Sequence, residues 1–267
     1  MKVVTWNLLH ATAILGADQG STLSEQAKLI QADIIGLQEV DRNQSRSGNT
    51  HQLHEVAQAL DLSYWVYAPT VLGTPGEDWN AAHDHHIHTN EHSLEHPSES
   101  HYGNALASKY PLSDIEILRF AAAPLSLPLL VPGDKKMQVI KVADEPRLAI
   151  IATAHTPRGP ITIATTHLSF VPGFNIKQLR KLVKHLAGRG QPALILGDFN
   201  LIGSLPRIIS RWDMMAKLAT YPVFKPRVQF DHILGHGFTD AEVAAARGSA
   251  QRLALGVSDH CALSITL

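Results

Sequence analysis

The segment Ala193-Leu194-Ile195-Leu196-Gly197-Asp198-Phe199-Asn200 contains the pattern from which the fold can be predicted. A short aliphatic run predicts a buried strand, and the polar side chains of Asp198 and Asn200 follow it directly. Side chains at the end of a strand can enter a shared cleft while the backbone beneath them stays rigid. Taken alone, the stretch from Gly197 to Asn200 is typical of an ordinary turn. Its significance depends on whether the pattern recurs.

The same pattern, an apolar run that ends in polar residues, recurs along the chain. The further motifs are Thr5-Trp6-Asn7, Leu37-Gln38-Glu39-Val40, Tyr102-Gly103-Asn104-Ala105, Thr166-His167-Leu168, Phe230-Asp231-His232-Ile233 and Ser258-Asp259-His260. Their side chains include carboxylates, amides and imidazoles, which are the groups that bind cations and move protons. We therefore expect these strand ends to meet in one cleft.

The segments between the motifs predict a mixture of strands and helices. Strands are predicted at residues 3–9, 34–40, 64–68, 148–155, 160–169, 193–196, 229–234 and 261–267. The strands at 148–155 and 160–169 are expected to form a hairpin around Pro157-Arg158-Gly159, a turn-favouring cluster. Helices are predicted at residues 21–33, with Ser21 or Thr22 as N-cap, at 51–60 and at 174–186. This mixture predicts an α/β fold with two packed β-sheets and helices outside. Because neither an internal repeat nor a linker is present, residues 1–267 are expected to form a single domain.

Composition and charge are those of a globular enzyme. Hydrophobic residues make up 45% of the chain, so a sizeable core is expected. Lys and Arg total 23 against 24 Asp and Glu, a formal charge of -1. Proteins that hold long nucleic acids through their phosphates usually carry a basic excess. The balance here weighs against a high-affinity, non-specific nuclease.

Location and assembly follow from what the sequence does not contain. Cys261 is the only cysteine, which excludes an intrachain disulfide. No leader pattern and no apolar run of membrane-spanning length is present. We therefore expect a cytoplasmic protein that acts as a monomer.

Residues 73–101 do not fit the pattern of the rest. This segment is polar, lacks apolar periodicity and holds seven histidines, His83, His85, His86, His88, His92, His96 and His101. It is predicted to be a long loop or mobile insertion that adds little to the core. Such tracts can bind Zn²⁺, Ni²⁺ or Cu²⁺, but without a rigid scaffold a solvated loop that binds metal only adventitiously is the favoured interpretation. A third interpretation is that the segment forms a flap over the cleft and helps to select the substrate.

The motif residues form a coherent set for hydrolysis of a phosphate ester. A hard cation such as Mg²⁺ prefers oxygen ligands, so Glu39 is the best direct ligand, with Asp259 and Asn7 completing or supporting the site. Asp198, helped by Asn200, is the candidate that orients and deprotonates a water molecule.

The histidines and the remaining motif residues supply the other roles. His260 oriented by Asp231 can donate to the phosphate, and His167 is the candidate for protonating the leaving group. Asn104 is a candidate for stabilising charge, whereas Tyr102 is either functional or part of the core.

In their order along the chain, these motifs resemble those of the endonuclease/exonuclease/phosphatase superfamily, which includes deoxyribonuclease I and neutral sphingomyelinases. The resemblance implies a four-layered α/β sandwich, dependence on Mg²⁺ or Mn²⁺, and the same roles for Glu39, Asp198, Asn200, Asp231 and His260. A histidine at position 167 is similar to the deoxyribonuclease I and sphingomyelinase side of the family. The insertion at 73–101 is not a general feature of it.

The sequence therefore predicts a metal-dependent phosphoesterase that acts on a phosphodiester or phosphomonoester. The sequence does not decide whether the substrate is a small molecule, a lipid headgroup or nucleic acid. A DNA or RNA nuclease of the same fold is therefore one alternative. The other is a non-catalytic protein that binds transition metals through the histidine-rich segment.

Overall fold

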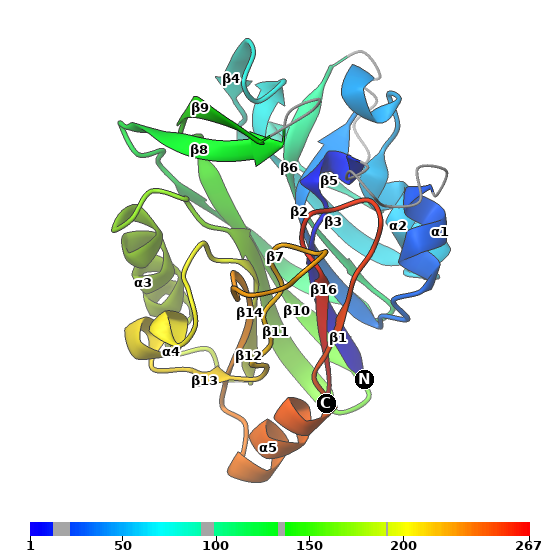
Figure 1. Cartoon of the computed structure of the whole chain (residues 1–267). Helices are drawn as coiled ribbons and strands as arrows, with labels where there is room; N and C mark the ends of the chain where they lie inside the picture. The colour runs from blue at the N-terminus through cyan, green and yellow to red at the C-terminus, as the bar shows by residue number, and fades with distance from the viewer. Residues whose placement is uncertain (13–21, 92–98, 133–136, 191) are drawn as a thin grey trace.

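Two mixed β-sheets form the centre of the molecule (Figure 1). The computed structural model describes residues 1–12, 22–91, 99–132, 137–190 and 192–267. The first sheet has the order β15 (Gln251–Leu253), β16 (Ala262–Thr266), β1 (Lys2–Asn7), β2 (Ile34–Arg42), β6 (His101–Ser108), β3 (Tyr64–Gly73) and β4 (Trp79–Ala81), with β5 (His88–Thr89) also paired to β3. Within it β1 and β2 are parallel, and the other pairs are antiparallel.

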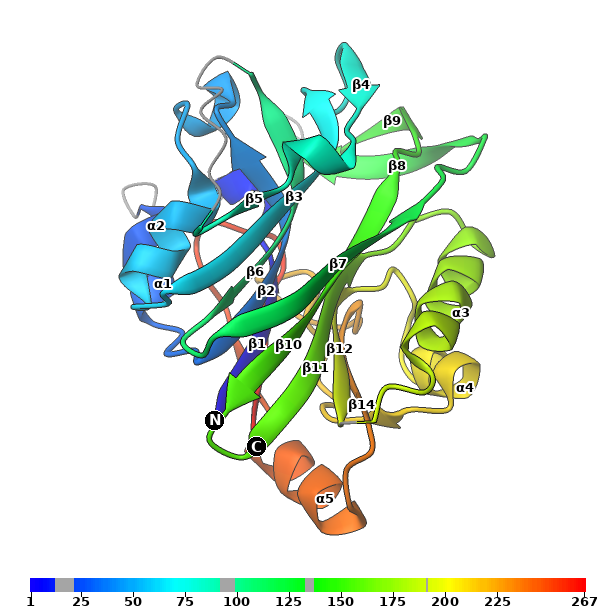
Figure 2. The same cartoon turned by 180° about the vertical axis from the view of Figure 1, so that it is seen from behind.

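The second sheet is built from the later part of the chain. Its order is β13 (Asp213–Met214), β14 (Asp231–His236), β12 (Ala193–Asp198), β11 (Gly159–His167), β10 (Arg147–Thr156) and β7 (Leu112–Phe120). Only β11 and β12 are parallel. The predicted hairpin is confirmed, since β10 and β11 pair from Ala149 with Thr166 to Thr156 with Gly159. A separate ribbon, β8 (Ser126–Pro132) with β9 (Met137–Ala143), lies beside the two sheets in Figures 1 and 2.

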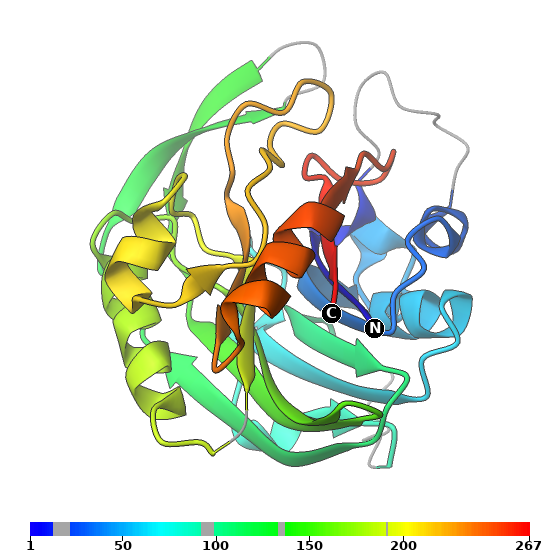
Figure 3. The same ribbon diagram turned by 90° about the horizontal axis from the view of Figure 1, so that it is seen from below.

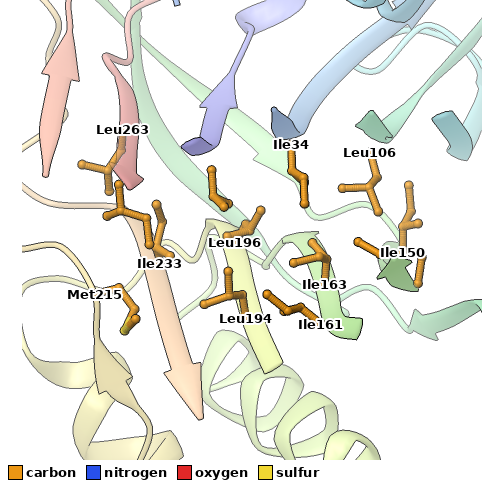
Figure 4. Close-up of a cluster of buried hydrophobic side chains, with 14 of the residues drawn as sticks. Ile34, Leu106, Ile150, Ile161, Ile163, Leu194, Leu196, Met215, Ile233 and Leu263 are labelled. Carbon is orange, nitrogen blue, oxygen red and sulfur yellow. The ribbon is translucent and has the colours of Figure 1, made fainter. Parts of the chain in front are cut away.

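The main hydrophobic core lies between the two sheets (Figure 4). Ile34 and Leu106 of the first sheet belong to the same buried cluster as Ile150, Ile163 and Leu196 of the second. These side chains alternate along their strands with residues that face outward, because successive side chains of a strand point to opposite faces. The inner face of each sheet is therefore closed by the other sheet.

Helices cover the outer faces. On the first sheet, α1 (Leu23–Lys28) and α2 (Gln52–Ala59) bury a cluster that includes Leu23 and Leu53. On the second, α3 (Phe174–Leu186) and α4 (Leu205–Ser210) bury a cluster that includes Leu179 and Leu182. The order helix, sheet, sheet, helix confirms the predicted four-layered α/β sandwich. The remaining helix, α5 (Asp240–Ser249), lies near the two termini (Figure 3).

The first predicted helix is shorter than expected. Residues 21–33 were predicted to be helical, but α1 ends at Lys28 and Gln31 adopts a left-handed φ of 54°. Thr22 is the N-cap and forms a capping box with Glu25, whereas Ser21 lies outside the described residues. The Asp33 side chain accepts the Lys2 backbone N–H at 2.7 Å, so the chain already lies along β1 where helix was expected.

The prediction that residues 73–101 add little to the core is wrong for part of this segment. β4 and β5 pair with β3, and the 3₁₀ turn η3 (Asp84–His86) lies between them. His88 and His101 are each only 1% exposed. Backbone pairing needs no apolar periodicity, which is why the sequence pattern did not reveal these strands. His92 and His96 lie outside the described residues.

No helix within the described ranges has both the length and the apolar composition needed to cross a bilayer.

Candidate functional site

The predicted strand ends meet at one edge of the sandwich, which we term the strand-end site. Asn7 is the last residue of β1, and His167 and Asp198 are the last residues of β11 and β12. Parallel strands end at the same edge, so His167 and Asp198 are paired in register, and Asp231 at the start of antiparallel β14 pairs with Asp198. This edge is opposite the end that carries the termini in Figure 1. Asn7 and Asp198, which are 191 positions apart in the chain, thus become neighbours.

Asn7 connects the two sheets at this edge. Its side-chain Nδ2 donates to Glu39 Oε1 at 2.8 Å and to Asp198 Oδ2 at 3.1 Å. Its Oδ1 accepts the Leu9 backbone N–H at 3.0 Å. Because both amide hydrogens point at carboxylates and the oxygen is already engaged, Asn7 positions Glu39 and Asp198. Of the two roles predicted for it, supporting the metal site fits these contacts better than direct ligation.

Glu39 owes its direction to an irregularity in β2. The register of β2 with β6 shifts between Leu37 and Val40, and Glu39 adopts a left-handed φ of 55°. A bulge of this kind changes where a side chain points, and bulges are common beside active sites. Burial raises the pKa of Glu39, against the lowering effect of its hydrogen bond from Asn7. A carboxylate in this position, with its side chain 17% exposed, can take part in holding a cation.

Asp198 is buried and held in a fixed orientation. Its Oδ1 accepts the Asn200 backbone N–H at 2.9 Å, and Asn200 adopts a left-handed φ of 50°. Burial raises the pKa of Asp198 to about 6, with the nearby His260 acting in the opposite direction. The preceding Gly197 has a φ of 147°, and a Cβ there would lie 1.8 Å from the Thr166 carbonyl oxygen. Only glycine allows β12 to approach β11 this closely next to the acid.

His260 is paired with Asp231. His260 Nδ1 lies 2.8 Å from Asp231 Oδ2, which also accepts the Thr220 hydroxyl at 2.5 Å. Burial lowers the pKa of His260, but the carboxylates of Asp231, Asp198 and Asp259 outweigh it and raise the pKa to about 10. His260 is therefore a cation at neutral pH. Its Nε2 lies 3.8 Å from Asp198 Oδ2 and 3.9 Å from Asp259 Oδ1.

His167 differs from His260 in its charge. Its Nε2 lies 3.2 Å from Asn200 Nδ2, which acts as the donor, and its Nδ1 is 3.9 Å from Glu39 Oε1. Burial lowers the pKa of His167 well below its ordinary value, and the positive charges of Arg147 and His260 act in the same direction. His167 is therefore neutral at physiological pH.

Asp259 and Glu39 offer oxygen atoms to a cation. Asp259 Oδ1 is buried and has no hydrogen-bond partner among the described residues. Burial raises the pKa of Asp259 to about 6, and the charge of Glu39 acts in the same direction. Two carboxylates whose charges interact, one with an unsatisfied oxygen, are a donor set that suits Mg²⁺ or Mn²⁺.

A second arrangement of possible ligands lies next to this one. One oxygen or nitrogen each from Asp198, Asp231 and His260 lie within 4.8 Å of one another. However, the Nδ1 of His260 and the Oδ2 of Asp231 already bond to each other at 2.8 Å, which leaves these two atoms engaged. We therefore favour Glu39 with Asp259 as the direct metal ligands.

Asn104 and Tyr102 lie on β6 at the wall of the site. Asn104 Nδ2 donates to the Leu148 carbonyl oxygen at 3.1 Å, so it also ties the first sheet to the second. Tyr102 is buried, and the Arg46 guanidinium carbon lies 5.5 Å from its ring centroid. Burial raises the pKa of Tyr102 well above its ordinary value, with Glu39 acting in the same direction. Tyr102 thus contributes to packing and lies close to the predicted metal ligand.

The sequence reasoning missed Arg147. This residue begins β10, and its Nη1 and Nη2 lie 3.2 Å from Glu145 Oε1 and 3.5 Å from Asp144 Oδ1. Arg147 Nε is buried and has no hydrogen-bond partner in the described part of the chain. Its charge acts on both Glu39 and His167, which places it beside the site. The sequence signal for Arg147 is the set of charged residues at 144–147 directly before an apolar strand. The polar residues of the motifs follow their strands, so this signal differs from theirs.

The chain that carries this site belongs to a known protein family. The sequence matches the Endonuclease/Exonuclease/phosphatase family over residues 4–260, nearly the whole chain, and the protein is a member of that family. Members act as hydrolases on phosphoesters, so the chain has the fold and family of a phosphoesterase or nuclease.

Solved structures share the fold at low sequence identity. Sphingomyelinase C from Streptomyces griseocarneus is 14% identical, with a TM-score of 0.57 and coverage of 99% of this chain and 98% of that one. The mannosyl-6-phosphatase Bt3783 of Bacteroides thetaiotaomicron is 14% identical, with a TM-score of 0.54 and coverage of 100% and 98%. Truncated Caenorhabditis elegans TDP2 is 14% identical, with a TM-score of 0.51 and coverage of 98% and 95%. Among curated proteins the sequence has no significant match.

Proposed function

We propose that the protein is a divalent-metal-dependent phosphoesterase that hydrolyses a phosphodiester or phosphomonoester with water. The observation that carries the proposal is the contact between the sheets, in which Asn7 holds Glu39 and Asp198 together while Asp231 holds His260. Acidic, neutral and cationic groups are then within a few ångströms of one another. Strands from both parts of the chain contribute, which supports a single domain over residues 1–267.

Glu39 and Asp259 would hold the cation, with Asn7 fixing the direction of Glu39. When bound, Mg²⁺ or Mn²⁺ supplies positive charge to the phosphoryl oxygens. The oxygen donors distinguish this position from one that would prefer zinc or copper.

Asp198 would orient the attacking water and accept its proton. A general base is most effective when its pKa lies near the working pH, and burial raises that of Asp198 to about 6. Its Oδ1 is held by the Asn200 backbone, which leaves Oδ2 directed towards Asn7 and the interior of the site.

His260 would stabilise the negative charge that develops on the phosphoryl group. As an imidazolium it donates through Nε2, while Asp231 on Nδ1 keeps it charged and oriented. We propose that Asn104 and Arg147, whose charge acts on Glu39 and His167, share this role.

His167 remains our candidate for protonating the leaving group, with one condition. Because it is neutral in the site as it stands, it can donate a proton only after the negative charge of the substrate has raised its pKa.

We propose that the substrate is a small molecule or a lipid headgroup. The formal charge of -1 offers no general attraction for long nucleic acid. Salt-sensitive degradation of plasmid or oligonucleotide, with no hydrolysis of small esters, would overturn this choice and favour a nuclease.

The activity test uses bis-p-nitrophenyl phosphate and p-nitrophenyl phosphate with Mg²⁺ or Mn²⁺. Glu39→Gln and His260→Ala should each lower the rate by at least about 100-fold, the lower end of what an acid–base or charge-stabilising group contributes. His155→Ala is the matched control, because His155 is exposed near the end of β10 that is opposite Arg147 and the strand-end site. Wild-type rates in both site variants would show the assignment to be wrong.

A further inference from the structure

Histidines outside the strand-end site gather on the η3 turn. His83 precedes this turn, and His85 and His86 lie within it. The centroids of the His83 and His85 rings are 6.0 Å apart, those of His83 and His86 are 6.3 Å apart, and those of His85 and His86 are 3.8 Å apart. Two imidazoles bound to one tetrahedral ion have ring centroids roughly 5 Å apart, given metal–nitrogen bonds of about 2 Å. Two of the three spacings, 6.0 Å and 6.3 Å, are about 1 Å longer than this, and the third, 3.8 Å, is about 1 Å shorter.

The turn is attached to the body of the protein on both sides. β4 before it and β5 after it are both paired with β3. Asp84 in the middle of the turn accepts Arg119 Nε of β7 at 2.8 Å. This is the rigid scaffold that the sequence pattern did not predict. With it, several imidazoles on one short segment can form a site without first ordering a loop.

His86 is prepared for ligation through one particular nitrogen. Its Nδ1 lies 3.1 Å from the His83 backbone nitrogen and 3.2 Å from the His83 carbonyl oxygen. A metal-bound histidine generally donates its other ring N–H to a carbonyl or carboxylate, which fixes its tautomer and orientation. The His83 N–H donates to Nδ1 when that nitrogen carries no hydrogen, so Nε2 binds the metal in the other tautomer, in which Nδ1 donates to the His83 carbonyl.

An acidic side chain lies at the inner side of the cluster. The ring of buried His101 is 6.0 Å from that of His86, and its Nε2 lies 3.2 Å from Glu99 Oε2. The Glu99 carboxylate is therefore close to the His86 ring. It also offsets part of the positive charge of Arg42, whose Nη1 is 3.4 Å from the other nitrogen of His101.

We propose that His83, His85 and His86 bind one transition-metal ion such as Zn²⁺, Ni²⁺ or Cu²⁺, with Glu99 within reach as a further ligand. Imidazole-rich sites select these ions over Mg²⁺, so this position differs in chemistry from Glu39 with Asp259. The ring nitrogens are not yet convergent, and the overlapping rings of His85 and His86 must rotate apart. His83 and His85 are exposed, which leaves their side chains free to do so.

Calorimetric titration of the full chain with NiCl₂ and ZnCl₂, in saturating Mg²⁺, tests the proposal. We expect one Ni²⁺ per chain in the wild type and a more than about 100-fold weaker affinity in the triple variant His83→Ala, His85→Ala, His86→Ala. Loss of a supporting residue alone costs 10- to 100-fold, so loss of three ligands must exceed this. A Cu²⁺ paramagnetic resonance spectrum should show nitrogen coupling that the triple variant lacks.

Two controls separate the site from general histidine content and from the strand-end site. The double variant His92→Ala, His96→Ala removes histidines from the same segment but none of the proposed ligands, and it should bind as the wild type does. Glu39→Gln should likewise keep the Ni²⁺ site, whatever its effect on hydrolysis. Unchanged binding in the triple variant, or equal loss in either control, would overturn the proposal. Circular dichroism of the triple variant confirms that it is folded.

Discussion

The strand-end site and the η3 turn use the same side chain, histidine, in opposite surroundings. His260 and His167 are nearly buried among carboxylates, amides and a guanidinium, and each has a fixed set of partners. His83 and His85 are exposed on the surface. In the first region the neighbours decide whether the ring is charged. In the second the rings remain free to rotate, which suits them to bind an ion that approaches from solvent.

The strand-end site itself contains a second contrast. His260 and His167 both lie near Oδ2 of Asp198, with nitrogen–oxygen distances of 3.8 Å and 3.7 Å. The pKa of His260 is nevertheless raised to about 10, whereas that of His167 is lowered. The difference arises because Asp231 bonds directly to His260, while His167 is next to Arg147 and to His260 itself. Burial amplifies whichever charge is nearest.

The largest effect is expected from a substitution that removes the difference between His260 and His167. This substitution replaces the carboxylate that keeps His260 charged. Asp231→Asn should lower the rate of ester hydrolysis by about 100- to 10,000-fold, because the imidazolium then loses its buried counter-ion. Steady-state rates with bis-p-nitrophenyl phosphate measure the change.

The matched control for Asp231→Asn is Asp213→Asn. Asp213 lies on the neighbouring strand β13 but makes only an exposed contact with Arg247. It should keep the wild-type rate. Equal rates in Asp231→Asn and the wild type would show that the Asp231–His260 pair is structural rather than functional.

A medium effect concerns two partly buried histidines, His51 and His54, outside both regions. His51 stacks on His54 with centroids 3.9 Å apart, and burial lowers the pKa of His51 to about 2. This value is below the ordinary 6.5 of the unfolded chain, so unfolding takes up a proton between pH 6.5 and pH 2. The contribution of His51 to stability is therefore fully present above pH 6.5 and is lost as the pH falls, by up to about 1.4 kcal/mol per pH unit.

Urea unfolding between pH 7 and pH 5 measures this slope. His51→Gln should flatten the dependence of the unfolding free energy on pH, whereas His155→Gln at an exposed position should not. An unchanged slope in His51→Gln would mean that His51 gains a proton in the folded protein as readily as in the unfolded one.

The smallest expected effect tests the exposed side of the comparison. In the presence of a chelator, His83→Ala and His85→Ala should each change the free energy of unfolding by less than about 0.5 kcal/mol, as is usual for exposed positions. Neither should alter ester hydrolysis. A loss of several kcal/mol would show that these rings pack against the protein rather than waiting for a ligand.

Much of the secondary structure could be predicted from the sequence because it depends on local pattern. The amphipathic helix at 174–186 has the same bounds in the structure, and the hairpin around Pro157-Arg158-Gly159 is present. The strands of the second sheet follow the aliphatic runs closely. Prediction failed where backbone pairing alone forms the strand, as in β4 and β5, since no side-chain periodicity marks them.

The candidate site was predictable in membership but not in its internal connections. The predicted residues lie at strand ends, in the adjoining loops, or within β2 and β6, as Glu39 and Asn104 do. No local pattern indicates that Asn7 bonds both Glu39 and Asp198, or that Thr220 shares Asp231 with His260. Arg147 was not predicted, because it is the first residue of its strand and not one of those that follow a strand. These contacts depend on how the two sheets are placed against each other.

The sequence by itself determined the order of strands and helices, the polar groups at strand ends, and the family to which they belong, because these depend on residue type and local spacing. Only the tertiary structure decided which groups are charged. His260 and His167 are the same residue at the ends of similar apolar segments, yet one is cationic and the other neutral. Their pKa values depend on distance and burial between distant parts of the chain, which no local pattern records.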